Sequence, residues 1–117
     1  MRGPILHGPR LTLKPIGLAE APQYVRWFAD KRVVRYLALQ TGFTLREEQK
    51  HIRSMFRKKN QFNLSIINEK GKHIGASGTT FFPKDKKASV GIVVGDKNEW
   101  GKGYATEVMK IVADYVF

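Results

Sequence analysis

Residues Val93 to Val108 read VVGDKNEWGKGYATEV, and this stretch decides the fold. An apolar strand runs through a short charged loop into two glycines that open an apolar helix. The first backbone N–H groups of a helix lack intrahelical partners and lie at the positive end of its dipole, so they can hold phosphate oxygens. Gly101 and Gly103 leave that backbone accessible, and Lys102 adds a cation. The pattern indicates a site for a phosphorylated ligand, although two glycines alone are more often just a tight turn.

Two familiar phosphate-binding loops do not fit these residues. A Walker loop needs Lys-Ser/Thr after its last glycine, whereas Tyr104 and Ala105 follow Gly103. A dinucleotide-binding fingerprint needs a third glycine or alanine where this chain has Thr106, and it needs a parallel sheet. The ligand class therefore depends on the rest of the chain.

Outward from this stretch, the sequence alternates between the periodicities of strands and helices. A capping box from Thr44 to Glu47 marks the start of a helix at Leu45, and the last three strands form an antiparallel meander. The predicted fold is α/β (α+β) with the order strand, helix, helix, three strands, helix. The predicted strands are 10–16, 61–67, 72–82 and 88–95; the predicted helices are 19–37, broken near Asp30, then one from 45 and one from 101.

Two details of this prediction concern single positions. Gly75 and Gly78 are expected at bulges or close approaches in the strand over 72–82. The second helix is expected to bury a stripe of apolar residues and to expose its basic residues. The expected stripe is Leu45, Ile52, Met55 and Phe56.

Length and composition set outer limits. The 117 residues, 42% of them hydrophobic, fit one folded domain. The absence of cysteine excludes disulfides, thiolate metal sites and a cysteine nucleophile, and it favours a reducing cytoplasm. No apolar run reaches the roughly 20 residues of a membrane span, and the first residues do not resemble a signal peptide. The three histidines lack metal-ligand spacing, so surface or packing roles and no metal site are expected for His7, His51 and His73.

The loop and several other segments resemble one family. Trp100 to Ala105 resembles the acetyl-CoA pyrophosphate loop of the GNAT N-acetyltransferase superfamily, Q/R-x-x-G-x-G/A, with Trp100 in place of Gln/Arg. Segments 9–15, 27–30 and 88–96 look like the ribosomal-protein N-terminal (alanine/serine) acetyltransferase branch, in which an aromatic residue at that place is common. The resemblance covers nearly the whole chain.

The resemblance implies a single GNAT-like domain over residues 1–117 that uses acetyl-CoA (coenzyme A). It implies direct acetyl transfer to a primary amine, either a protein N-terminus or a small amine. The strand before the loop would offer backbone groups to the pantetheine arm, the loop amides would take the pyrophosphate, and a strand N–H would polarise the thioester carbonyl. The implied cofactor-binding residues are Val93, Val94, Gly95, Trp100, Gly101, Lys102, Gly103, Tyr104, Ala105 and Thr106.

The chain departs from the family pattern in two places. Relatives with an A-E-I-G-I pattern carry an acid where this chain has Ser89, so catalytic residues stay unassigned. Glu107 is expected to be a solvated or helix-supporting residue rather than a base. The family fold normally continues past this helix with a strand, a helix and a hairpin. A truncated product, a second chain that completes the sheet as a homodimer, and another closure of the fold remain open.

The charge separates two hypotheses for function. The chain carries 21 basic and 10 acidic residues, and 13 of the basic ones but only 4 of the acidic ones lie in the first 60 residues. In the resembling family the first two helices flank the acceptor, so this charge disfavours polycationic amines and suits an acidic protein or a ribosome-bound peptide. The rival hypothesis is a noncatalytic basic module that binds RNA or the ribosome.

Overall fold

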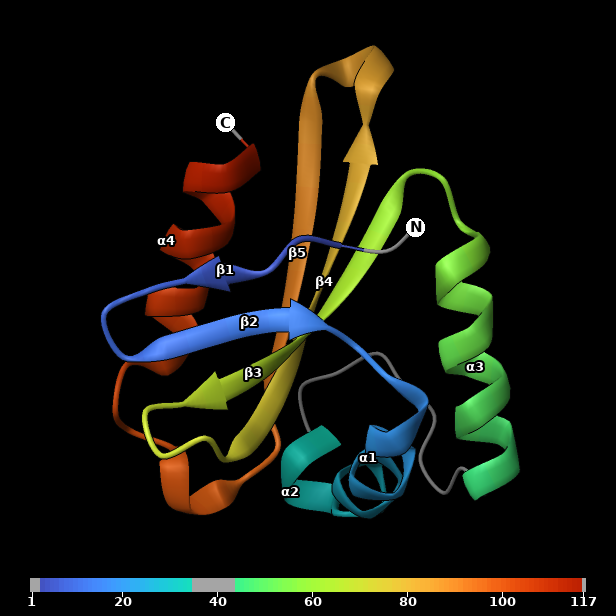
Figure 1. Cartoon of the computed structure of the whole chain (residues 1–117), viewed down its shortest axis with the longest axis vertical. Helices are drawn as coiled ribbons and strands as arrows, with labels where there is room; N and C mark the ends of the chain where they lie inside the picture. Colours follow the sequence, from blue (N-terminus) through green and yellow to red (C-terminus); the bar gives the residue numbers. More distant parts are fainter. Residues whose placement is uncertain (1–2, 35–43, 117) are drawn as a thin grey trace.

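The computed structural model describes residues 3–34 and 44–116. Within these ranges, five strands form one antiparallel sheet in chain order, and helices lie on both of its faces (Figure 1). The strands are β1 (Leu6–His7), β2 (Leu11–Pro15), β3 (Gln61–Asn68), β4 (His73–Phe82) and β5 (Lys87–Val94). The helices are α1 (Ala21–Phe28), α2 (Lys31–Val34), α3 (Leu45–Arg57) and α4 (Tyr104–Val116).

The predicted order of elements is confirmed, with small shifts at the ends. The sequence did not predict β1, a two-residue strand that pairs with β2 and packs Leu6 against the core. The helix predicted over 19–37 is present as α1 and α2, and its end at Leu37 lies outside the described residues. None of the described helices is long and apolar enough to span a membrane.

The break between α1 and α2 falls at Asp30, as predicted. The Asp30 carboxylate accepts a hydrogen bond from the backbone N–H of Arg32 at 2.9 Å. Its backbone carbonyl accepts from the N–H of Val33 at 3.1 Å. A short acidic side chain thus caps the new turn of helix, which is why the chain restarts there.

Each face of the sheet has its own core. Toward α4, alternate residues of β2, β3 and β4 pack against Tyr104, Val108 and Val112. Toward α1 and α3, Ile16, Tyr24, Trp27 and Ile52 form the second cluster, with Ala76 and Val93 from the sheet beneath them. Because successive residues of a strand point to opposite faces, β5 contributes Ile92 to the first core and Val93 to the second.

The capping box that starts α3 is confirmed, but the buried stripe of this helix differs from the prediction. Leu45 and Phe56 are 44% and 38% exposed, whereas Glu48 is 2% exposed. Glu48, Ile52 and Met55 recur at i, i+4 and i+7, so they share the face that turns toward the sheet. The prediction counted only apolar residues and therefore missed a carboxylate on the inward face.

The expected close approach at Gly75 is present. A Cβ at this position would lie 2.1 Å from the backbone oxygen of Val93 on the neighbouring strand. The β3–β4 register shifts opposite it, between Ile66 and Ile67. Only glycine therefore lets β4 approach β5 this closely at Gly75.

Candidate functional site

A groove of about 630 Å³ lies between the outer edge of β5 and the start of α4. Eight of the ten residues predicted for cofactor binding line it, since Gly95 and Lys102 do not. The Lys102 ammonium pairs with the Glu99 carboxylate at 2.9 Å. The groove also contains residues that the sequence did not single out for this role: Arg32, Val33, Ile92 and Glu99.

The edge of β5 presents specific backbone groups to this groove. The Gly95 N–H donates to the Ile74 carbonyl at 2.9 Å, so it faces β4. Because the groups of an antiparallel strand alternate in direction, the N–H and C=O groups of Ile92 and Val94 face outward. The Val94 carbonyl accepts a hydrogen bond from Trp100 Nε1 at 2.6 Å. Trp100, 45% exposed, is thereby fixed beside the groove.

The first turn of α4 leaves backbone amides open to the groove. Gly101 and Gly103 have φ values of +80° and +76°, a region that side chains other than glycine rarely adopt. The first N–H that closes an α-helical turn is that of Glu107, which donates to the Gly103 carbonyl at 3.2 Å. The amides from Tyr104 to Thr106 precede it. A Cβ at Gly101 would meet no atom within 4 Å, so the approach is clear.

Arg10, from the turn between β1 and β2, holds this loop from the outside. Its Nε donates to Glu107 at 2.7 Å, and its Nη1 donates to the Lys102 carbonyl at 2.8 Å. The guanidinium also lies 4.6 Å from the centre of the Tyr104 ring, and the Glu107 hydrogen bond raises the pKa of Arg10. Glu107 therefore supports its helix, as predicted. Sequence reasoning missed Arg10, because no local pattern links residues 97 positions apart.

A second hollow, of about 450 Å³, lies on the other face of β5, between the sheet and helices α1 and α3. Its walls are mostly apolar. Its lining residues are Ile16, Tyr24, Phe28, Glu48, His51, Met55, Gln61, Asn63, Ala76, Ser77, Gly78, Gly91, Ile92 and Val93. Ile92 and Val93 line the groove as well, so the two hollows meet at β5.

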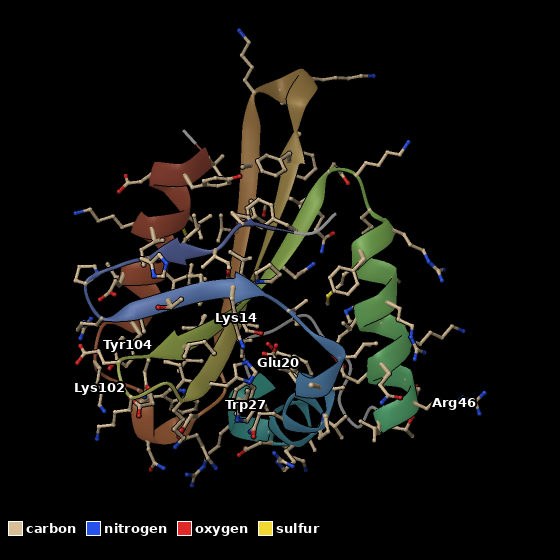
Figure 2. All side chains as sticks on the ribbon, viewed as in Figure 1. Lys14, Glu20, Trp27, Arg46, Lys102 and Tyr104 are labelled. Atoms are coloured by element: carbon tan, nitrogen blue, oxygen red, sulfur yellow. The ribbon has the colours of Figure 1, made fainter. Side chains whose placement is uncertain are left out.

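A buried polar network stands beside the second hollow. The Tyr24 hydroxyl lies 2.9 Å from Ser65 Oγ and 2.9 Å from His73 Nε2, and the Ser65 hydroxyl also donates to the Glu20 carboxylate. Burial raises the pKa of Tyr24 and lowers that of His73. The packing role expected for His73 is thus confirmed. Figure 2 shows Glu20 and Trp27 near α1, well apart from Lys102 and Tyr104 at the start of α4.

The other polar residues considered in the sequence lie on the protein surface or around the second hollow. Ser89 is exposed on the same face of β5 as Gly91 and Val93, next to the second hollow but outside its lining. His51 lines that hollow, and burial together with Lys58 lowers its pKa. The basic residues Arg46, Lys50, Arg53 and Arg57 are exposed on α3, and Figure 2 shows Arg46 extending into solvent.

Comparison with known proteins identifies the family. The family model described as "Acetyltransferase (GNAT) domain" matches residues 10–117, so the chain belongs to the GNAT acetyltransferase family. It is 29% identical over 119 residues to an uncharacterized N-acetyltransferase p20 of Bacillus licheniformis, covering 96% of this chain and 65% of that protein. The chain thus spans just under two thirds of this curated relative.

Solved structures show the same fold. A spermidine N-acetyltransferase from Vibrio cholerae, in complex with CoA and spermine, matches 94% of this chain and 65% of its own with a TM-score of 0.83 and 14% identity. An acetyl transferase from Salmonella typhimurium that modifies the N-terminal serine of ribosomal protein L7/L12 matches 96% of this chain and 67% of its own, with a TM-score of 0.78 and 15% identity.

Proposed function

We propose that the chain is an N-acetyltransferase that binds acetyl-CoA in the groove beside α4 and passes the acetyl group to a primary amine. The observation that carries the proposal is the joining of an open strand edge to a cradle of helix-terminal amides. The outward groups of Ile92 and Val94 lead directly to the amides from Tyr104 to Thr106. An extended ligand with amides at one end and a diphosphate at the other fits this order.

The residues fit such a cofactor in detail. Amides of the pantetheine arm would pair with the outward backbone of Ile92 and the N–H of Val94, and the diphosphate would lie on the first turn of α4. The cofactor supplies an activated acetyl thioester. In the reaction, the ammonium would first lose one proton to water, and the neutral amine nitrogen would bond to the acetyl carbon. The carbon–sulfur bond would break, and a second proton from the nitrogen would go to the sulfur, so that CoA leaves as a thiol. The shared wall at Ile92 and Val93 would bring amine and thioester together.

The acceptor and the partners of this enzyme are inferred from its relatives and from the charge on its surface. The relatives act on a polyamine in one case and on a ribosomal protein in the other. The exposed basic stripe of α3 supports an acidic protein or the ribosome as the partner of this chain, in a cytoplasmic setting. The part of the β5 edge that precedes the groove, at residues 87–91, is where a second chain would complete the sheet as a homodimer.

Titration calorimetry with CoA tests the proposal. We expect the wild-type protein to bind CoA, and Gly103→Asp to weaken binding by about a hundredfold or more, because it adds a strained, negatively charged residue at the diphosphate. Gly71→Asp is the matched control, since Gly71 has nearly the same φ, +77°, in the β3–β4 turn, where a Cβ would contact nothing. It should leave CoA binding unchanged.

The same titration with single-stranded and duplex RNA tests the rival hypothesis. A protein that binds RNA through its basic stripe and shows no affinity for CoA would overturn the acetyltransferase proposal. Equal CoA affinity in Gly103→Asp and Gly71→Asp would show that CoA binds elsewhere and would remove the groove from the proposal.

A further inference from the structure

The hollow between the sheet and α3 contains a buried carboxylate that the fold itself does not use. Glu48 is 2% exposed and lines the hollow, and no charged or hydrogen-bonding group among the described residues offsets the effect of burial on its carboxylate. Burial raises the pKa of Glu48, which means that the ionised carboxylate is destabilised where it lies. A buried carboxylate without a partner is costly, so such a group calls for a counterion.

A second polar group in the same hollow is also unsatisfied. The Nδ2 atom of Asn63 is buried and has no hydrogen-bond partner in the described part of the chain. Asn63 pairs with Gly78 across β3 and β4, and a Cβ on Gly78 would come within 2.7 Å of Asn63 Oδ1. The amide therefore lies over the glycine, on the floor of the hollow. Buried amide groups are normally paired, so this donor lacks an acceptor oxygen.

The floor is shaped by the absence of side chains. Gly78 pairs with Gly91 on β5, which extends a row that begins at Asn63. A Cβ at Gly91 would meet no atom within 4 Å, although the position is in the middle of a strand. The walls are apolar and include Ile16, Phe28 and Met55. The hollow therefore has room for an apolar group directly beside the strand that separates it from the groove.

The charged groups around the hollow limit the charge of the ligand that it can bind. Among the described residues that line it, Glu48 is the sole acid and His51 the sole group that can become a cation. Burial and Lys58 lower the pKa of His51, which favours its neutral form. The Tyr24 hydroxyl is already shared between Ser65 and His73. A ligand with a single positive charge would therefore match the single negative charge of this apolar hollow.

From these observations we infer that the hollow is the acceptor site, that Glu48 binds the ammonium group of the acceptor and Asn63 an oxygen near it, and that the acceptor is a monoamine with an apolar body. The inference rests on the proposed function, and it names the substrate class of that site. A polyamine would place further ammonium groups against apolar walls, where no carboxylate compensates their lost hydration. This result narrows the choice of acceptor that the net charge of the chain left open.

Nuclear magnetic resonance titration of the free protein with three probes tests the inference. The probes are 2-phenylethylamine, its neutral isostere 2-phenylethanol, and spermine. We expect wild-type protein to prefer the amine over the alcohol by about tenfold or more, because a hydrogen bond to a charged group in a dry site contributes strongly. Spermine should bind no more tightly than 2-phenylethylamine.

Glu48→Gln should abolish this preference, while Glu47→Gln should keep it. Glu47 is the neighbouring, exposed acid of the same helix, and its replacement by Gln preserves the capping box with Thr44. The two variants therefore lose the same charge one residue apart. Glu48→Gln should also unfold at a denaturant concentration equal to or above that of the wild type, since it removes an unpaired buried charge. A purely structural Glu48 would give a lower midpoint and unchanged amine preference.

Three results would overturn the inference: no binding of 2-phenylethylamine by wild-type protein, equal preference in Glu48→Gln and wild type, or tighter binding of spermine that survives Glu48→Gln. A CoA titration of the same samples separates this inference from the proposed function. Protein that binds CoA but no amine contradicts the acceptor site alone. Protein that binds the amine through Glu48 but no CoA contradicts the acetyltransferase proposal alone.

Discussion

The two hollows on either side of β5 are built in different ways. The groove beside α4 is lined mainly by residues 92–94, 99–101 and 103–106, two neighbouring stretches of the chain that present backbone groups to it. The pocket beneath α3 is lined by side chains from α1, α3, β3, β4 and β5. A site made of backbone from one stretch tolerates sequence change as long as its glycines remain. A site made of side chains from five elements changes its specificity with each of them.

The largest expected effect comes from Gly95, which follows β5 and packs against the Trp27 ring of α1. A Cβ at Gly95 would lie 2.1 Å from the Trp27 ring, so Gly95→Ala must push α1 away from the sheet. We expect a loss of about 1–3 kcal/mol in the free energy of unfolding, measured in urea. Gly91→Ala, in the same strand with an open surround, should stay within about 0.5 kcal/mol of wild type. Equal stability of the two variants would contradict the Trp27 contact.

A substitution at Gly91 tests whether the two hollows bind their ligands independently. Gly91→Val fills the floor of the pocket without touching the groove, because Gly91 lines the pocket but does not line the groove. We expect 2-phenylethylamine binding to fall by about tenfold or more and CoA binding to stay within about twofold. Gly91→Ala should give an intermediate loss. A parallel fall of CoA and amine affinity would show that the hollows act as one site.

The smallest expected effect concerns Arg10, which touches the groove only through the loop that it holds. Arg10→Ala removes its contacts with Glu107, Lys102 and Tyr104, and it should weaken CoA binding by roughly three- to fivefold while leaving amine binding unchanged.

Lys14→Ala provides the matched control for Arg10→Ala, because it removes an exposed positive charge from β2 outside both hollows. An equal loss of CoA affinity in this variant would show that Arg10→Ala weakens binding only by lowering the net charge of the protein. A positioning role is further tested by Arg10→Lys, which keeps the charge but cannot make the same set of hydrogen bonds and should bind CoA as weakly as Arg10→Ala.

The sequence predictions were correct where the structure depends on neighbouring residues and incomplete where it depends on distant ones. The periodicity of 61–67 and 88–95 and the capping box at Thr44 depend on near neighbours, and β3, β5 and α3 form where they were predicted. The break at Asp30 was predictable because a short acidic residue can cap its own turn. The strand β1 was not, since two residues carry no periodic signal and it is pairing with β2 and packing on the core that order them.

The buried stripe of α3 was predicted only in part. Leu45 and Phe56 were expected to be buried on account of their hydrophobicity, but they lie at the two ends of α3 and are exposed, whereas the line through Ile52 and Met55 packs toward the sheet. Glu48 lies on that line. Helical spacing places Glu48 on the same side as Ile52, but it does not say that a carboxylate on that side is buried.

By itself the sequence determined the order of elements and the loop from Trp100 to Thr106, because strand, glycines and helix start are properties of adjacent residues. Only the tertiary structure decided that Arg10 holds this loop and that Glu48 and Asn63 lie above Gly91. These residues come together through sheet pairing and helix packing, which bring distant positions into contact without any local pattern. Burial then changes their chemistry, and no spacing in the chain records how deeply a carboxylate is buried.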